Sequence, residues 1–171
     1  MASAYKFESE KKCYVTSAAP GQIWTLMVSG NGGIGPAADG YGIAFFDYEG
    51  GVSVNEVEYS KNGEKFFAFQ TSNRNYPTTF LRATTNSVMF NCQTIMNYKD
   101  DIDKNVQEIF TKDLITIDGK NYTRLASIHY PGLYAKKVPY HVLKADLYGL
   151  TLENFVENDL NFAFEFSYPS T

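Results

Sequence analysis

The sequence has little cysteine and little histidine, and each shortage excludes a class of protein. Two cysteines, Cys13 and Cys92, are too few for a disulfide-built scaffold and have no neighbours at metal-ligand spacing. We expect both to be buried free thiols, with a single bridge between them as the alternative. The two histidines, His129 and His141, lie near no nucleophile motif and form no zinc-site pattern. We therefore expect neither a metal nor a cofactor.

Membrane-spanning and targeting patterns are missing as well. No run approaches the ~20 apolar residues that a transmembrane helix needs. The start of the chain, MASAYKFESEKK, carries charged residues where a secretory signal has an apolar region. For the chain as given we expect a cytoplasmic location, and extracellular action stays open.

Positive charge is in short supply. Fifteen basic residues stand against 19 acidic ones, for a net charge of −4, and both kinds are spread along the chain. Binding to nucleic acid relies on clustered basic residues that attract the phosphate backbone. We therefore expect no nucleic-acid partner.

Aromatic side chains are what the sequence has in excess. Thirteen Tyr, thirteen Phe and one Trp make up 16 % of the 171 residues, and aromatic residues favour strands. Short runs rich in Val, Ile, Thr, Tyr and Phe alternate with turn signals along the whole chain. This pattern predicts an all-β chain, namely a single antiparallel β-sandwich domain over residues 1–171 with about nine to eleven short strands.

Two hairpins can be placed on this scheme. Asn62-Gly63 in YSKNGEKF and Asp118-Gly119 in ITIDGKNYT each separate two strand-like runs. Asn-Gly and Asp-Gly tolerate the positive φ angles of a type I′ turn. Both pairs therefore predict tight two-residue turns between neighbouring strands.

Two helices are predicted to interrupt the strands. Ile102, Val106 and Ile109 recur at helical spacing after acidic residues suited to a helix start, which predicts a moderate helix over about 101–112. A shorter helix is predicted over about 151–158 in the run LTLENFVEN.

A glycine motif follows the apolar run at residues 22–28. Gly30, Gly32 and Gly35 form a G-x-G-x-x-G pattern, which in a dinucleotide-binding fold opens a long crossover helix. Here Gly40 and Gly42 follow almost at once and the next run is already strand-like, so such a helix has no room. We interpret the stretch as a loop between strands, either structural or touching a ligand through its backbone amides.

A short acidic run has the spacing of the first ligands of an EF-hand loop. Asp101, Asp103 and Asn105 match that spacing, but Val106 stands where the loop needs Gly and Lys112 where it needs Glu. The favoured interpretation is the start of a helix. Weak surface binding of a cation is the alternative.

Two loops, TSNRNYPTT and HYPGLYAKK, combine aromatic and polar side chains. Sugar sites pair an aromatic face with groups that bond hydroxyls, and membrane-interface sites pair Tyr with Lys or Arg. The candidate ligand-binding residues in these loops are Asn73, Arg74, Asn75, Tyr76, Tyr130 and Tyr134.

These observations predict a non-enzymatic binding or assembly protein. The first expectation is a carbohydrate- or membrane-surface-binding module, lectin-like or toxin-like, that acts on a glycan or a membrane surface. The alternative is a self-assembling structural subunit of a coat, appendage or inclusion, in which aromatic residues and edge strands join copies. In either case we expect a homo-oligomer. A small enzyme with a cleft around His129 and His141 is the third hypothesis.

Overall fold

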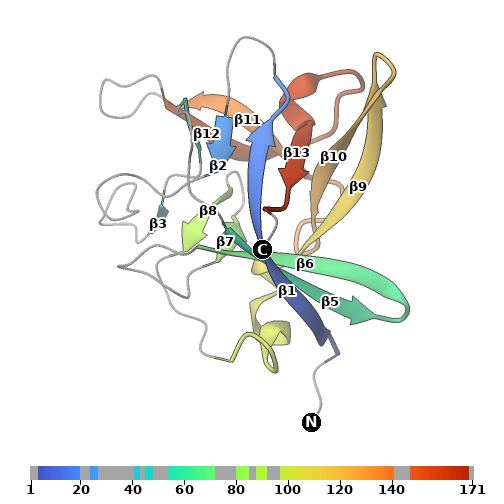
Figure 1. Ribbon diagram of the computed structural model, residues 1–171. Helices are drawn as coiled ribbons and strands as arrows, with labels where there is room; N and C mark the ends of the chain where they lie inside the picture. Colours follow the sequence, from blue (N-terminus) through green and yellow to red (C-terminus); the bar gives the residue numbers. More distant parts are fainter. Residues whose placement is uncertain are drawn as a thin grey trace.

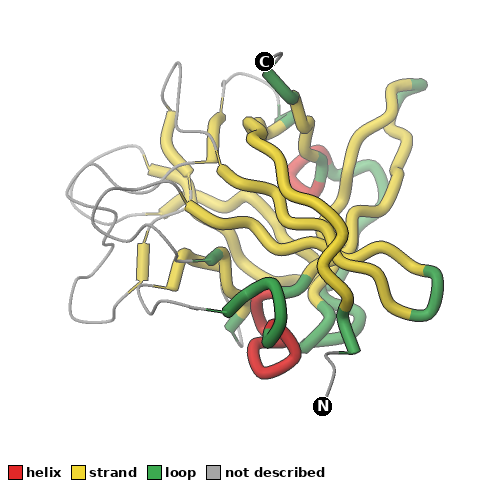
Figure 2. Tube along the Cα trace, turned by 60° about the horizontal axis from the view of Figure 1, so that its bottom comes forward, coloured by secondary structure: helices red, strands yellow, loops and turns green. Residues whose placement is uncertain are grey.

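The computed structural model describes residues 4–19, 24–26, 41–42, 45–47, 54–71, 80–84, 88–91, 97–140 and 147–169. Within these ranges the chain is mostly strand, which confirms the predicted all-β class (Figures 1 and 2). The strands are β1 (Lys6–Ser17), β2 (Trp24–Leu26), β3 (Tyr41–Gly42), β4 (Phe45–Asp47), β5 (Val54–Lys61), β6 (Glu64–Thr71), β7 (Leu81–Ala83), β8 (Val88–Asn91), β9 (Phe110–Ile117), β10 (Lys120–Ser127), β11 (Tyr134–Tyr140), β12 (Leu147–Glu153) and β13 (Phe164–Ser167). The described residues also contain the short 3₁₀ helices η2 (Ile102–Glu108) and η3 (Leu160–Phe162).

The strands form one antiparallel sheet rather than the two stacked sheets of a sandwich. Neighbours follow the order β11-β10-β9-β6-β5-β1-β2-β4-β12-β8-β3, and β11 also pairs with β12. That last pairing closes the path on itself, while β13 lies between β1 and β10. The alternation of apolar residues predicts strands but does not encode how a sheet closes, so the antiparallel β prediction is confirmed and the two-sheet detail differs.

Among the described residues, buried side chains form two clusters that share β6. Phe67 and Phe69 point into one cluster, and Phe66 and Ala68 point into the other. Successive side chains of a strand face opposite sides of the sheet, so β6 is buried on both faces. This explains the unbroken apolar run FFAF at residues 66–69.

Both predicted type I′ turns are confirmed. Asn62 and Gly63 have φ values of 54° and 79°, and Asp118 and Gly119 have φ values of 50° and 77°. The first turn joins β5 to β6, and the second joins β9 to β10. In Figure 1 the β9–β10 hairpin projects from the body of the molecule beside β13.

The first predicted helix is shorter than expected. In place of a helix over 101–112, η2 ends at Glu108 and is kinked at Asn105, and Phe110 already begins β9. Phe110 pairs with Phe67 of β6 and is fully buried, so burial in the sheet outweighs the helical spacing.

The second predicted helix, over 151–158, is wrong. Residues 151–153 complete β12, where Leu150 and Leu152 are buried at alternate positions. The next short helix is η3, whose cap Asp159 accepts a hydrogen bond from the Asn161 amide at 2.9 Å. Strand pairing with β11 therefore outweighs the local helical pattern. Across the ranges given above, no helix has the length and apolar character needed to cross a membrane.

Candidate functional site

The sheet splits where β10 meets β13. β13 pairs with β1 along its whole length, from Tyr14↔Ser167 to Ser17↔Phe164. Its pairing with β10 is confined to Thr123↔Phe164. Continued antiparallel pairing would set Tyr122 opposite Glu165, but β10 stays with β9 while β13 stays with β1. The two strands therefore diverge and form a fork.

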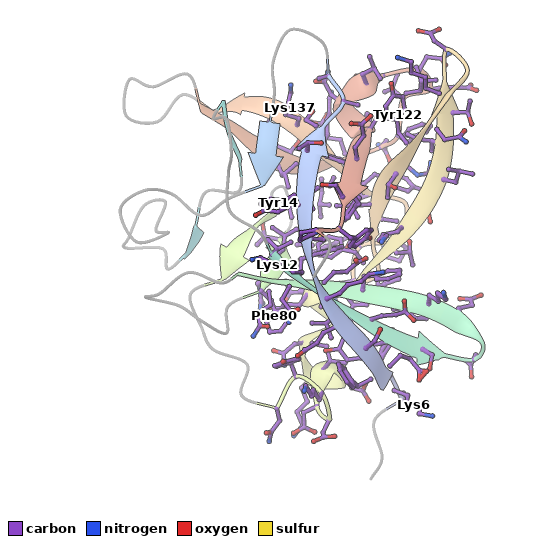
Figure 3. All side chains as sticks on the ribbon, viewed as in Figure 1. Lys6, Lys12, Tyr14, Phe80, Tyr122 and Lys137 are labelled. Carbon is purple, nitrogen blue, oxygen red and sulfur yellow. The ribbon has the colours of Figure 1, made fainter. Side chains whose placement is uncertain are left out.

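A cavity of about 330 Å³ occupies this fork. We call it the hairpin groove; its lining residues are Lys112, Leu114, Asn121, Tyr122, Thr123, Phe164, Glu165, Phe166 and Tyr168. The first two come from β9, the next three from β10, and the others from β13 and the residue that follows it. Figure 3 labels Tyr122 on β10, the hairpin strand next to β13. The volume falls at the small end of the ~300–1,000 Å³ typical of ligand pockets.

The rim of the hairpin groove exposes large apolar side chains. Leu114 is 74 % exposed and Tyr168 is 41 % exposed. Behind them, Phe166 is half-buried against the core and Phe164 is fully buried. Exposed aliphatic and aromatic groups beside a hollow are characteristic of surfaces that bind other molecules.

The wall of the groove contains a neutralised charge. Lys112 forms an ion pair with Glu56, whose side chain is only 1 % exposed. The Lys112 ammonium also donates to the Tyr168 hydroxyl at 2.9 Å and lies over the Phe67 and Phe166 rings at 4.4 and 4.7 Å. Lys112 is thus held by an acid and by aromatic faces, and its charge is already compensated.

The Tyr168 hydroxyl belongs to the same network. Burial of the hydroxyl and its hydrogen bond with the Glu56 carboxylate raise its pKa. The Lys11 ammonium also lies over the Tyr168 ring, 4.2 Å from the ring centre. Tyr168 is therefore fixed in place at the rim and stays protonated at neutral pH.

Tyr134, one of the predicted ligand-binding residues, is partly buried and packs against other side chains of the chain. The Arg124 guanidinium lies 4.1 Å from the centre of its ring, and the Phe155 ring packs edge-on against it at 5.9 Å. Arg124 is held in turn by Asp113, at 3.0 Å from its Nη2. One face of Tyr134 is thus covered by a side chain of the chain itself and is closed to a sugar ring.

Tyr130 is also turned inward. It is half-buried against the core cluster that contains Phe110, and its hydroxyl accepts a hydrogen bond from Gln107 at 3.5 Å. His129 is exposed and meets the Tyr130 ring edge-on at 4.6 Å. Tyr130 and Tyr134 thus pack against neighbouring side chains around β10 and β11, and neither lines the hairpin groove. Their part in ligand binding stays a prediction.

Several predicted positions lie outside the described residues. These are His141, Cys92, the loop residues Asn73, Arg74, Asn75 and Tyr76, and the loop glycines Gly30, Gly32 and Gly35. The proposed cleft between the two histidines and the proposed role of the glycine loop thus stay predictions.

The acidic run at the start of η2 has a structural role. The Asp103 carboxylate accepts hydrogen bonds from the Ala4 amide at 2.6 Å and the Tyr5 amide at 3.1 Å. Asp101 forms an ion pair with Lys104 at 3.8 Å. Asp103 thereby ties the start of the chain to η2.

Cys13 is a free thiol in the core, as expected of it. It is fully buried, and burial together with the charge of Glu56 raises its pKa to about 12. A thiol held in its neutral form is a poor nucleophile, so Cys13 is a packing residue.

Sequence reasoning missed the residues of the hairpin groove. The alternation of Phe164, Phe166 and Tyr168 was visible as strand spacing, but nothing in the sequence indicates where two strands part. One usable signal was Leu114, an aliphatic residue that follows Lys112 and Asp113 in a predicted hairpin strand.

Comparison with known proteins shows the fold. No protein-family profile and no curated protein sequence matches the chain. Among solved structures, a variant of chicken (Gallus) interleukin-1 beta superposes with a TM-score of 0.63 at 11 % identity, covering 95 % of this chain and 99 % of that one. A second Gallus interleukin-1 variant gives 0.55 at 13 % identity with the same coverage. The chain thus shares the β-trefoil fold of these interleukins over nearly its whole length.

Proposed function

We propose, taking the interleukin-1-like β-trefoil as the premise, that this chain is a non-enzymatic binding protein that recognises another protein through the hairpin groove. The observation that carries the proposal is the exposed pair Leu114 and Tyr168 at the mouth of the cavity. Burying a leucine side chain is worth about 1.5–3 kcal/mol. Large apolar and aromatic groups of this kind dominate the affinity of protein interfaces.

The chemistry of the lining supports binding over catalysis. The nine lining residues include no histidine and no cysteine, and their one lysine is paired with Glu56. A general acid or base would need a titratable group aimed into the cavity and free to exchange a proton. Two titratable groups in the wall, Lys112 and Tyr168, instead hold each other in place through a hydrogen bond.

A carbohydrate ligand is the second candidate. Tyr122 together with Asn121 and Glu165 gives the groove the aromatic and polar groups that a sugar site combines. A protein partner is favoured because the exposed Leu114 side chain offers an aliphatic contact. In addition, the Lys11 ammonium already covers one face of the Tyr168 ring, which a sugar ring would otherwise stack on.

Selection from a phage-displayed random peptide library tests the proposal. Peptides enriched on the wild-type chain should bind Leu114→Glu about tenfold more weakly or worse, as expected for an interface anchor. The matched control is Val156→Glu, which changes another exposed apolar residue, 54 % exposed, away from the groove. Peptides that bind Leu114→Glu as well as the wild type would contradict the proposal. Binding of the wild type to a glycan array that Leu114→Glu loses, without any enriched peptide, would favour the second candidate.

A further inference from the structure

We infer that the partner segment enters the hairpin groove as an extended strand with alternating apolar and basic side chains, and adds to the sheet at the fork between β10 and β13. This inference rests on the proposed function, since it names the chemistry of the partner at the same groove. Its three supports are the strand edges, the floor of the cavity and the charge of its wall.

The strand edges supply main-chain partners. Beyond Thr123↔Phe164, residues 120–122 of β10 and residues 165–167 of β13 do not pair with each other across the fork. In the described part of the chain, the other neighbours of these segments are β9 and β1, each on the far side. An unpaired strand edge presents a row of N–H and C=O groups that an extended peptide can bind.

The floor of the cavity supplies a place for an apolar side chain. Phe164 and Phe166 lie at alternate positions of β13 and line the groove together with Leu114 of β9. Side chains of an added strand alternate between the two faces of the sheet. Every second residue of the partner would therefore contact this apolar surface, and the residues between would face away from it.

The charge of the wall favours a basic partner. The Lys112 charge is cancelled by Glu56, whereas Glu165 is exposed on β13 and forms no ion pair within the described ranges. The net charge of the chain, −4, is negative like the charge of Glu165. A second copy of the chain in a twofold contact would bring Glu165 close to its own equivalent, and like charges oppose such a contact.

The test uses the full chain labelled with ¹⁵N and four short synthetic peptides. The first alternates Lys with Val or Phe, the second replaces each Lys by Glu, the third carries main-chain N-methyl groups on one edge of the basic peptide, and the fourth carries them on its other edge. The basic peptide should bind the wild type, and one of the two N-methylated peptides should bind about tenfold more weakly, because N-methylation removes the donors that strand pairing uses. Amide signals of residues 120–122 or 165–167 should become protected from hydrogen exchange.

Two variants test the charge. Glu165→Lys should remove the preference for the basic over the acidic peptide, and Glu157→Lys, a matched change at an exposed turn residue, should leave it intact. An unchanged preference in Glu165→Lys would overturn the assignment of a basic partner.

The remaining outcomes separate this inference from the proposed function. Equal binding of both N-methylated peptides, with binding still lost in Leu114→Glu, would overturn strand addition and leave the groove as a binding site. Binding that Leu114→Glu does not weaken would overturn both. A concentration-dependent dimer in sedimentation analysis, abolished by Leu114→Glu, would overturn the inference by making a second copy the occupant.

Discussion

The burial of Glu56 is a feature that its position in the sequence does not predict. A glutamate between Asn55 and Val57 in a hairpin strand reads as a solvent-facing residue, yet its side chain is 1 % exposed. Lys112, far along the chain on β9, compensates its charge. Tyr134 is a similar case, because the guanidinium that covers its ring comes from Arg124 on the neighbouring strand β10. Contacts between strands of this kind are not encoded in any local motif.

Removing the positive charge beside Glu56 should destabilise the protein. Lys112→Met should lower the free energy of unfolding by about 3–5 kcal/mol, because an unpaired buried carboxylate is left behind. The double variant Glu56→Gln with Lys112→Met should recover most of the loss, since the buried group is then neutral. Urea unfolding of the wild type and both variants measures this. If the single variant is as stable as the wild type, Glu56 reaches water in solution and the buried pair is wrong.

The buried thiol of Cys13 should make the stability of the protein depend on pH in alkaline solution. Burial raises the thiol pKa from 9.0 to about 12, so the folded state holds its proton after the unfolded state has lost it. The contribution of this thiol to the free energy of unfolding is fully present below pH 9. It is lost as the pH rises towards 12, and the free energy of unfolding then falls by up to about 1.4 kcal/mol per pH unit. In Cys13→Ala the free energy of unfolding should fall less steeply as the pH rises from 9.0 towards 12. Equal slopes in urea titrations of the two proteins would show that the thiol is not shielded.

At the scale of elements, the turn is the part of the β9–β10 hairpin that sequence reasoning predicted best, because the start of β9 at Phe110 falls within the helix predicted over 101–112. A type I′ turn requires positive φ at two successive positions, which Asp-Gly tolerates and few other residue pairs do. The sequence signal for the turn is therefore local and strong. The helix predicted over 151–158 failed for the opposite reason. Its apolar spacing suited a helix, but Leu150 and Leu152 are buried by pairing with β11, which lies elsewhere in the chain.

Two matched glycine variants separate stability from binding at this hairpin. Gly119→Ala and Gly63→Ala each place a Cβ at positive φ, 77° and 79°, where the added carbon meets no other atom within 4 Å. Each should therefore cost about 1–2 kcal/mol of backbone strain, measured by thermal unfolding. Only Gly119→Ala should also weaken binding of the selected peptides, because β9 and β10 form one wall of the hairpin groove. Equal loss of binding in both variants would mean that the hairpin has no special part in it.

At the scale of the whole molecule, the sequence predicted the class of the fold but not its closure. Aromatic content and regular turn signals were enough for an antiparallel β protein. The pairing of β11 with β12, which closes the sheet, joins segments that share no sequence pattern. The likeness to interleukin-1 at 11 % identity makes the same point, because a common fold persists here with few common residues. The hairpin groove lies where β13 leaves β10. These strands are distant in the sequence, so their divergence could not be predicted from local patterns.

The most direct test of the account is to map a library-selected peptide onto the ¹⁵N-labelled wild-type chain by NMR. If the hairpin groove is the binding site, the largest shifts should fall at Leu114, Tyr122, Phe166 and their sequence neighbours. Shifts concentrated instead around Val156 and Phe155, with the groove signals unchanged, would contradict it.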